Sequence, residues 1–374
     1  MKVSILQENL ARGLGIASRS VATRAQLPIL NNVLISTDKG RLKISATNLE
    51  TGVNLWLGAK VEKQGSVAIP AKILTEFVAN LPVGKVELET KENRLTLVSG
   101  TYRASFVGLP ASEFPAIPSL TEKDKGVVFE GEALSQAVSQ VAFAAAIDEG
   151  RPVLTGVLFV VEEEGLRLIA TDGYRLSLKK VDLSKQSKVK ELIGGLIVPA
   201  KALQEVARVI DNSEDKKITL AVTAEKNQII INSSDVEVVS RLVEGEFPDY
   251  QRIIPEKGST EIEMDRQELV RAVKMASIFA RESANIVKFE SKGSLLKISA
   301  NTAQVGDNLS QVSVKTKGEG GKIAFNSRYL LDFLSVVDSD LISFEMSGSL
   351  DPGVFRLKGK SSLLHIIMPV RVQE

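Results

Sequence analysis

The sequence predicts an α+β protein of three similar domains, each with two helices packed on mainly antiparallel sheets. Three sets of internal repeats indicate this architecture, because a strand-and-turn pattern and two helix patterns each recur at intervals of about 125–135 residues. The chain has 374 residues, more than one ordinary core organises. Predicted strands outnumber predicted helices and do not alternate with them one for one, which favours antiparallel sheets.

The first repeat is an alternating apolar segment that ends in an alanine and a short polar turn. Alternation with a period of two, bounded by Gly, Asn and Asp, is typical of strands that enter turns. The three copies are GRLKISATNLETG (40–52), GLRLIATDGYRLS (165–177) and GSLLKISANTAQVG (293–306). Asp172 matches Asn48 and roughly Asn301, so we expect it to serve the turn. The middle copy alone adds Gly173, Tyr174 and Arg175.

The helix patterns also recur three times in one register. The second helix of each domain follows an anchor residue and shows apolar positions at +3, +4, +7 and +8, the stripe of a helix lying on a sheet. The three anchors are Pro70, Pro199 and Asn326. The first helices align at Leu10, Leu134 and Leu269, each with a small residue three positions later. We expect these small residues to permit close packing.

Polar linkers place the domain boundaries near 120–127 and 255–260. The segment TEKDKG (121–126) is charged and ends in glycine, as linkers between domains do. The expected domains are 1–121, 127–255 and 256–374.

Composition excludes most enzyme chemistry. The chain has no cysteine, so disulfides and thiolate ligands are impossible, and its one histidine, His365, lies in an apolar run that predicts a strand. We expect no metal and no cofactor. No segment predicts a signal peptide or a membrane span, and a cytoplasmic location is expected.

Basic residues are placed regularly although the net charge is only +1. The second position after each helix anchor holds Lys72, Lys201 or Arg328. A cation near a helix N-terminus is mildly unfavourable, which suggests that these residues face a polyanion. Alternatively, each pairs with the acid four residues later on a solvated face. The residues alone leave both interpretations open.

The three domains, the octet ATDGYRLS (170–177), EFPDY (246–250) and the terminal MPVRV (368–372), in this order, resemble the bacterial sliding clamp family, the β subunit of the replicative DNA polymerase. The resemblance covers essentially the whole chain. It implies the DNA clamp fold and a closed head-to-tail ring of two protomers that encircles duplex DNA without sequence specificity and slides along it. Such a processivity factor has no enzymatic activity, does not engage membranes, and acts in DNA replication.

The resemblance also implies functional residues. The expected partners are the polymerase catalytic subunit, the clamp loader and other proteins with short clamp-binding peptides. The residues that match the family's peptide pocket are Leu154, Thr171, Gly173, Tyr174, Arg175, Leu176, Pro248, Arg252, Ile253, Asn326, Tyr329, Leu350, Ile366, Ile367, Met368, Pro369, Val370 and Arg371. Those expected to face DNA are Arg24, Lys72, Lys201, Arg271, Lys274 and Arg328.

The sequence allows two other functions. One is a repeat protein that scaffolds other proteins without encircling DNA. The other is a hydrolase that uses Asp172 with Tyr174 or Arg175. The single histidine and the turn role expected for Asp172 weigh against the hydrolase.

Overall fold

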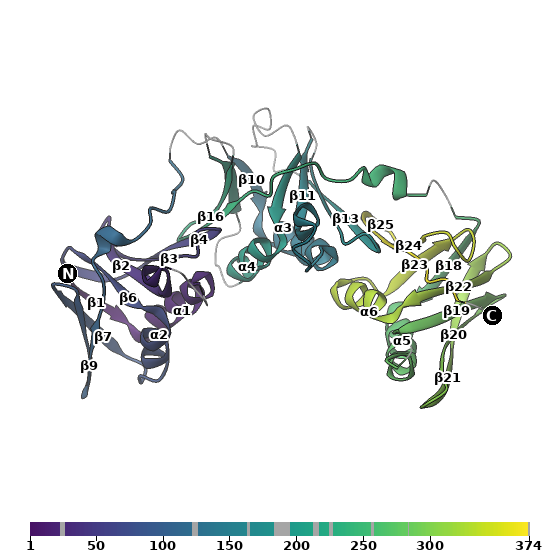
Figure 1. Cartoon of the computed structure of the whole chain (residues 1–374), viewed down its shortest axis with the longest axis horizontal. Helices are drawn as coiled ribbons and strands as arrows, with labels where there is room; N and C mark the ends of the chain where they lie inside the picture. Colours follow the sequence, from purple (N-terminus) through teal and green to yellow (C-terminus); the bar gives the residue numbers. More distant parts are fainter. Residues whose placement is uncertain are drawn as a thin grey trace. The chain divides into compact units, whose positions relative to one another are not determined.

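A computed structural model describes residues 1–22, 27–121, 126–162, 165–182, 195–211, 217–223, 227–255, 258–282 and 284–372. The described chain falls into two compact units. Figure 1 labels the helices and strands of both. Unit 1 takes in residues within 1–132 and 208–242, and unit 2 takes in residues within 133–182, 195–207 and 243–372.

Unit 1 contains two antiparallel sheets. In chain order its elements are β1 (Lys2–Leu6), α1 (Gln7–Ala17), β2 (Asn32–Asp38), β3 (Arg41–Thr47), β4 (Thr51–Leu57), β5 (Lys60–Lys63), β6 (Ser66–Pro70), α2 (Ala71–Ala79), β7 (Lys85–Lys91), β8 (Arg94–Ser99), β9 (Tyr102–Val107), β10 (Val127–Glu130), β15 (Lys217–Val222), β16 (Gln228–Ser233) and β17 (Val236–Arg241). One sheet has the order β5-β1-β7-β8-β9, and the other has the order β10-β15-β16-β17-β4-β3-β2-β6. The pairing of β17 with β4 therefore joins the middle repeat to the first.

Unit 2 is organised around one long antiparallel sheet. Its elements are α3 (Gly131–Val141), β11 (Gly156–Val161), β12 (Gly165–Thr171), β13 (Arg175–Asp182), β14 (Gly195–Pro199), α4 (Ala200–Asp211), β18 (Thr260–Asp265), α5 (Arg266–Ala280), β19 (Ile286–Lys292), β20 (Leu295–Thr302), β21 (Gly306–Lys317), β22 (Gly321–Asn326), α6 (Ser327–Val336), β23 (Leu341–Met346), β24 (Gly353–Leu357) and β25 (Lys360–Ile367). Residues 131–132 of α3 and 208–211 of α4 belong to unit 1. The strand order is β14-β11-β12-β13-β25-β24-β23-β18-β21-β20-β19-β22. Here β13 pairs with β25 and joins the middle repeat to the third.

The predicted α+β class and the repeated pair of helices are confirmed. The second helices α2, α4 and α6 each begin one residue after the predicted anchor. The expected close packing is clearest in α1, where a Cβ added to Gly13 would lie 2.7 Å from Leu57 Cδ1 on β4. Within the described residues, no helix is long and apolar enough to cross a membrane.

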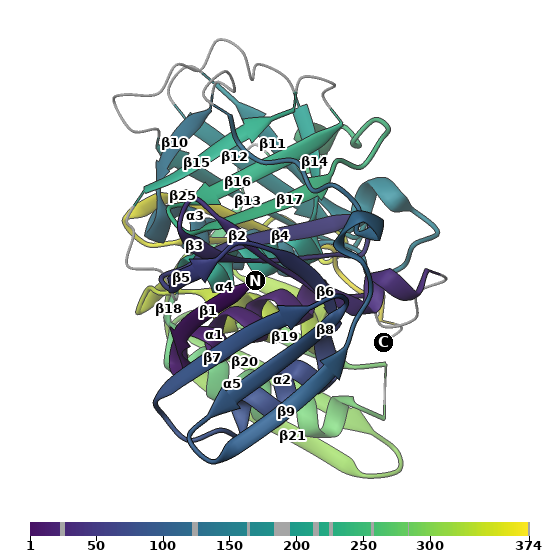
Figure 2. The same cartoon turned by 90° about the vertical axis from the view of Figure 1, so that its left-hand side faces the viewer.

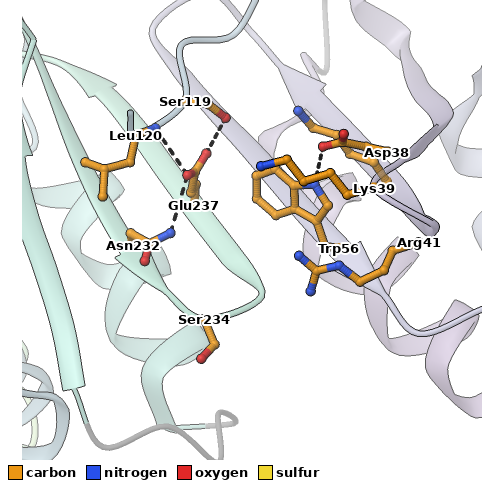
Figure 3. A pocket seen from close by; sticks show the side chains of 10 residues that line it. Asp38, Lys39, Arg41, Trp56, Ser119, Leu120, Asn232, Ser234 and Glu237 are labelled. Carbon is orange, nitrogen blue, oxygen red and sulfur yellow. Dashed lines mark hydrogen bonds between the residues drawn. The ribbon is translucent and has the colours of Figure 1, made fainter. Parts of the chain in front are cut away.

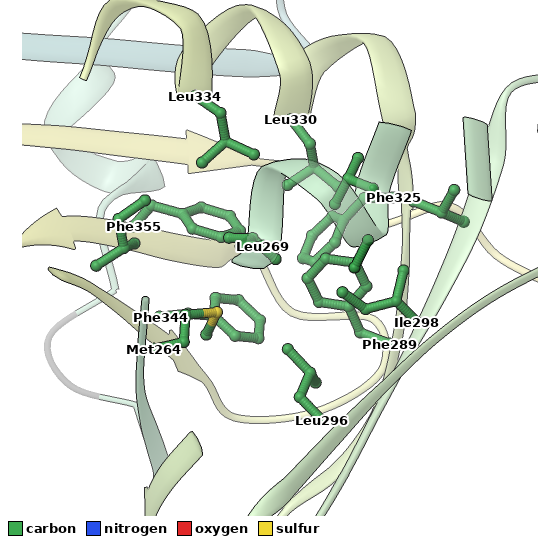
Figure 4. Packing of buried hydrophobic residues seen from close by; sticks show 14 of the residues in the cluster. Met264, Leu269, Phe289, Leu296, Ile298, Phe325, Leu330, Leu334, Phe344 and Phe355 are labelled. Carbon is green, nitrogen blue, oxygen red and sulfur yellow. The ribbon is translucent and has the colours of Figure 1, made fainter. Parts of the chain in front are cut away.

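An aromatic cluster fills the core of the third repeat (Figure 4). The ring of Phe325 makes edge contacts with Phe289 and Phe344 at centroid distances of 5.6 and 5.8 Å, and Phe344 stacks on Phe355 at 4.7 Å. Gly353 on β24 completes this packing, because a Cβ there would lie 2.4 Å from Phe325 Cζ. The cluster thus requires the absence of a side chain at this strand position.

His365 lies on β25, as the sequence predicts for a strand residue, but it is fully enclosed rather than half-buried. Its ring stacks on Phe333 at 4.6 Å, and its Nδ1 lies 3.2 Å from Ser177 Oγ. Since that hydroxyl donates to Gln140 O, Nδ1 acts as the donor and the bare Nε2 faces the core without a partner. Burial, with the nearby Arg175 charge, lowers the pKa of His365 to about 3. A neutral, enclosed imidazole cannot serve as a catalyst.

Replacing Gly353 by Ala should lower the free energy of unfolding by about 1–3 kcal/mol, because the added methyl group overpacks the aromatic cluster. Thermal and denaturant unfolding measure the change. Gly15→Ala is the matched control: nothing lies within 4 Å of its added Cβ on α1, so a helix-favouring gain of about 0.5–1 kcal/mol is expected. A Gly353→Ala variant as stable as the parent would show that the cluster has spare room.

Stability should fall as the pH drops below about 6.5, the pKa of an unfolded histidine. Between that pH and about 3, the unfolded chain binds a proton that buried His365 refuses, so protonation favours unfolding. The expected loss is at most about 1.4 kcal/mol per pH unit, or about 2 kcal/mol at pH 5. His365→Phe should remove most of this slope because the chain has one histidine. An unchanged slope in melting curves from pH 7 to 5 would assign it to other groups.

Candidate functional site

The middle and third repeats are tied together by backbone hydrogen bonds near Tyr174. In the β13–β25 ladder, Leu176 lies opposite Ile366. Beyond β25 the chain passes the turn that precedes β13 (residues 171–175). There Met368 N donates to Tyr174 O over 2.8 Å. Val370 N then donates to Ala324 O on β22, also over 2.8 Å. The terminal segment is thereby held against both repeats.

Hydrogen bonds from two side chains build the turn at 171–175. Asp172 Oδ1 accepts from the backbone N–H groups of Tyr174 and Arg175, at 2.9 and 3.0 Å. Thr171 Oγ1 accepts from Gly173 N and donates to Arg175 O. Gly173 has φ of +92°, in the left-handed region that glycine adopts without steric cost. The turn role expected for Asp172 is confirmed.

The first repeat contains the same turn with different residues. Asn48 Oδ1 accepts hydrogen bonds from the backbone N–H groups of Glu50 and Thr51, two and three residues later. Leu49 has φ of +76° at the position that corresponds to Gly173. Gly173 therefore serves the shared turn, so the prediction that it is peculiar to the middle copy is wrong. The rough match of Asn301 is also wrong, since this residue lies inside β20 and the third turn falls after Thr302.

Arg175 is the centre of the contact between the repeats. Its side chain is 8% exposed, and three of its N–H groups donate inside the protein. Nε donates to Asp172 Oδ2 at 3.0 Å, Nη1 to Asp332 Oδ2 on α6 at 2.6 Å, and Nη2 to Phe143 O at 2.9 Å. The guanidinium also lies 4.6 Å from the ring centroid of Tyr329 on α6. One buried cation thus connects the turn, the segment after α3, and α6.

Burial separates the expected pocket residues into two groups. Those buried are Leu154, Thr171, Arg175, Leu176, Ile366 and Ile367. Those half-buried or exposed are Gly173, Tyr174, Pro248, Arg252, Ile253, Asn326, Tyr329, Leu350, Met368, Pro369, Val370 and Arg371. Tyr174 is 60% exposed beside the terminal segment. Burial raises the pKa of the half-buried Tyr329 phenol, with the charge of Asp172 adding to the effect.

Two parts of the expected pocket lie outside these direct contacts. Arg252 is largely exposed, and its Nε pairs with Asp249 Oδ2 at 2.8 Å. Leu350 is 55% exposed in the turn between β23 and β24. By contrast, Tyr250 in the same segment as Arg252 is buried in one apolar cluster with Leu176 and Ile366.

Sequence reasoning missed Asp332, Phe143 and Tyr250. Asp332 carried a signal, because an acid occurs at its position in all three second helices, but that pattern suggested a pair with Arg328. In the structure, the Asp332 carboxylate forms an ion pair with Arg175 instead. Phe143 contributes a carbonyl oxygen and a ring 5.4 Å from the guanidinium, and a backbone carbonyl has no sequence signature.

Each described residue that was expected to face DNA is exposed on a helix: Lys72, Lys201, Arg271, Lys274 and Arg328. Arg24 lies outside the described residues. In the third repeat Asp332 pairs with Arg175, and no local ion pair between Arg328 and Asp332 is found in the part of the chain that the structure describes. No ion pair joins Lys72 to Glu76 among the described residues either.

The arrangement offers no hydrolytic chemistry at Asp172. Both of its carboxylate oxygens accept hydrogen bonds, from the backbone of the turn and from Arg175. Among the described residues, no group of three or more His, Cys, Asp or Glu side chains is placed to hold a metal ion. The arrangement instead holds a turn and a terminal segment together.

Comparison with known proteins identifies a single family along the chain. Residues 1–118, 129–249 and 251–371 match the N-terminal, central and C-terminal domains of the DNA polymerase III beta subunit. The beta sliding clamp of Synechocystis is 30% identical over the full length of both chains. The solved beta subunit of Thermotoga maritima is 30% identical with a TM-score of 0.90, and the sliding clamp of Bacillus subtilis is 27% identical with a TM-score of 0.92, both covering 100% of each chain.

The matches span all three repeats in order, and they agree with a site that has turn and packing functions but no reactive groups. The chain therefore belongs to the DNA polymerase III beta-subunit family of sliding clamps, which are non-enzymatic processivity factors of DNA replication.

Proposed function

We propose that two copies of this chain close head to tail around duplex DNA and slide along it as a processivity clamp. The ring tethers the catalytic subunit of the replicative polymerase, and the clamp loader and other partners engage it through short peptides. Its three clamp domains span 1–121, 127–255 and 256–374, and it acts in the cytoplasm. No catalysis is involved.

The single observation that carries head-to-tail closure is a free strand edge in each unit. In unit 1, β9 pairs only with β8 among the described strands (Figure 2). In unit 2, β21 pairs with β18 only through residues 314–317, so residues 306–313 have β20 on one side and no described strand on the other. Edges of this kind are templates for pairing with another chain.

Exposed apolar side chains accompany both edges. Val107 and Tyr102 lie on β9 and Ile73 on α2, all more than half exposed. Leu309 lies on β21 and Ile278 on α5, again more than half exposed. Two different surfaces that complement each other form a head-to-tail contact, and such contacts produce a ring when the rotation closes.

The charge of the chain suits sliding. A net charge of +1 gives no strong overall attraction to phosphates, so topological linkage must supply the retention on DNA. The exposed residues Lys72, Lys201, Arg271, Lys274 and Arg328 would contact the backbone weakly from the helices. Contacts of this type carry no sequence information, as a sliding protein requires.

The peptide site is proposed at Tyr174, Tyr329 and the terminal segment 368–371. Partly exposed aromatic and methionine side chains suit adaptable apolar anchors on a peptide. The buried members of the set support this surface from below. In particular, Arg175 acts as a positioning residue, because its guanidinium holds the Asp172 turn and Asp332 of α6 in one arrangement.

Val107→Asp should convert the ring into single protomers, because a charge on β9 would be desolvated in the head-to-tail contact. Light scattering should report the mass of one chain at concentrations where the parent has twice that mass. Leu49→Asp is the matched control: it also changes an exposed apolar residue to Asp, but on the β3–β4 turn, which belongs to neither free edge.

The same variants test encirclement. The parent ring, once loaded on circular DNA, should remain bound and should be lost when the circle is cut. Val107→Asp should be lost from both forms, whereas Leu49→Asp should behave as the parent. Equal retention of the parent on cut and uncut DNA would contradict the topological mechanism.

Met368→Ala should abolish binding of polymerase-tail peptides, because it removes an adaptable apolar contact beside Tyr174. Fluorescence polarisation with a labelled peptide measures the affinity, and light scattering should show an intact ring. Lys292→Ala, on an exposed position of β19 remote from the proposed set, is the control for a side-chain truncation. Unchanged affinity in Met368→Ala would place the peptide site elsewhere.

A further inference from the structure

A hollow of about 310 Å³ lies in unit 1 where the middle repeat meets the first (Figure 3). One wall comes from the β2–β3 hairpin and from Trp56 on β4. The opposite wall comes from the β16–β17 hairpin and from Ser119 and Leu120. The β4–β17 ladder connects the walls, and Trp56 N donates to Asp235 O at 2.9 Å. The backbone of the two walls is therefore joined by hydrogen bonds.

Trp56 provides a half-buried aromatic surface flanked by cations. Lys43 lies directly across the strand pair, with Nζ 4.7 Å from the ring centroid, and Arg41 Cζ lies at 5.9 Å. The indole Nε1 donates to Asp38 Oδ2 at 2.7 Å, which fixes the ring orientation. An oriented tryptophan with nearby cations is a suitable surface for a ligand that combines apolar area with negative charge.

The acids around the hollow already have partners. Glu237 is buried, and its carboxylate accepts from Ser119 Oγ at 2.5 Å and from Leu120 N at 3.2 Å. Asp235 pairs with Arg41 at 2.6 Å. Lys39 and Lys43 make no ion pair with any described residue. The charges left for a ligand are therefore two ammonium groups, both on the Trp56 wall.

We propose that this hollow, the Trp56 groove, binds an acidic peptide segment of a partner protein. Carboxylates of the peptide pair with Lys39 and Lys43, and a neighbouring aromatic or aliphatic side chain packs on Trp56. The volume accommodates one or two side chains, so the groove would recognise a short peptide motif.

The distribution of charge favours a peptide over nucleic acid. Asp38 and Glu237 line the same hollow, and each would repel a phosphate backbone that carries a charge on every nucleotide. A peptide can place its carboxylates against the lysines and leave neutral backbone near the acids. Its N–H groups can also donate to the remaining lone pairs of those acids.

This inference goes beyond the proposed clamp function and concerns different residues from the Tyr174 site. The Tyr174 site offers mainly aromatic and methionine surface, with Arg175 buried beneath it and Arg371 exposed at its end. The Trp56 groove offers accessible cations. The two sites would therefore select peptides of different composition.

The chain has one tryptophan, so its fluorescence reports on this groove alone. The full-length protein is titrated at low salt with the blocked peptide EDLFED, with KKLFKK as the charge-reversed control and with the oligonucleotide (dT)8. The acidic peptide should change the emission saturably with a Kd below about 1 mM. Neither KKLFKK nor (dT)8 should do so.

Charge reversal at the groove tests the assignment of the cations. The double variant Lys39→Glu, Lys43→Glu should weaken EDLFED binding by at least about fivefold, as expected for two partly exposed ion pairs. Lys60→Glu on β5, an exposed lysine of the same repeat outside the groove, should bind as the parent does. Circular dichroism confirms that both variants are folded.

Three outcomes would overturn the proposal. The first is no saturable change with EDLFED. The second is equal affinity for KKLFKK, or tighter binding of (dT)8, which would assign the groove to another ligand class. The third is unchanged affinity in the folded double variant.

Discussion

At each of the two joints between repeats, an antiparallel strand pair carries the sheet from one repeat into the next. These pairs are β4 with β17 and β13 with β25. The backbone polar groups on the facing edges of each pair bond to the neighbouring repeat, so separation of the repeats would leave a row of unpaired groups. Both candidate binding surfaces lie beside one of these strand pairs, which holds the backbone on either side of the surface together. The side chains beside each joint then determine what the surface can bind.

Features that depend on local physics could be predicted from the sequence. Helix starts follow from the anchors Pro70, Pro199 and Asn326, because proline and a side-chain cap suit the beginning of a helix. The role of Asp172 follows from comparison with Asn48, since a short polar acceptor satisfies two backbone donors in each turn. Burial of His365 follows from its apolar neighbours. Each of these needs only a few adjacent residues.

Contacts between distant residues could not be predicted in the same way. Asp332 has Arg328 four residues before it, and only the folded structure shows that it binds Arg175, 157 positions earlier in the chain, instead. Leu49 gives no sign in the sequence that its backbone adopts the conformation of Gly173, because leucine disfavours positive φ. Family resemblance supplied the pocket residues as a set. Only the structure shows that Tyr174 is exposed, so that it can contact a peptide, and that Arg175 is buried, so that it can only position its neighbours.

The two joints show how one architecture can acquire two recognition chemistries. At the β13–β25 joint, a cation is placed inside: Arg175 is neutralised by two carboxylates, and Tyr174 and Met368 lie on the surface beside it. At the β4–β17 joint, the buried charge is an acid, Glu237, which is satisfied by neutral donors, so lysines on the facing wall stay available. A buried charge that is paired internally removes that charge from recognition, whereas the unpaired opposite charge remains for a ligand. The choice of which charge is buried at a joint thus decides what the adjoining surface can bind.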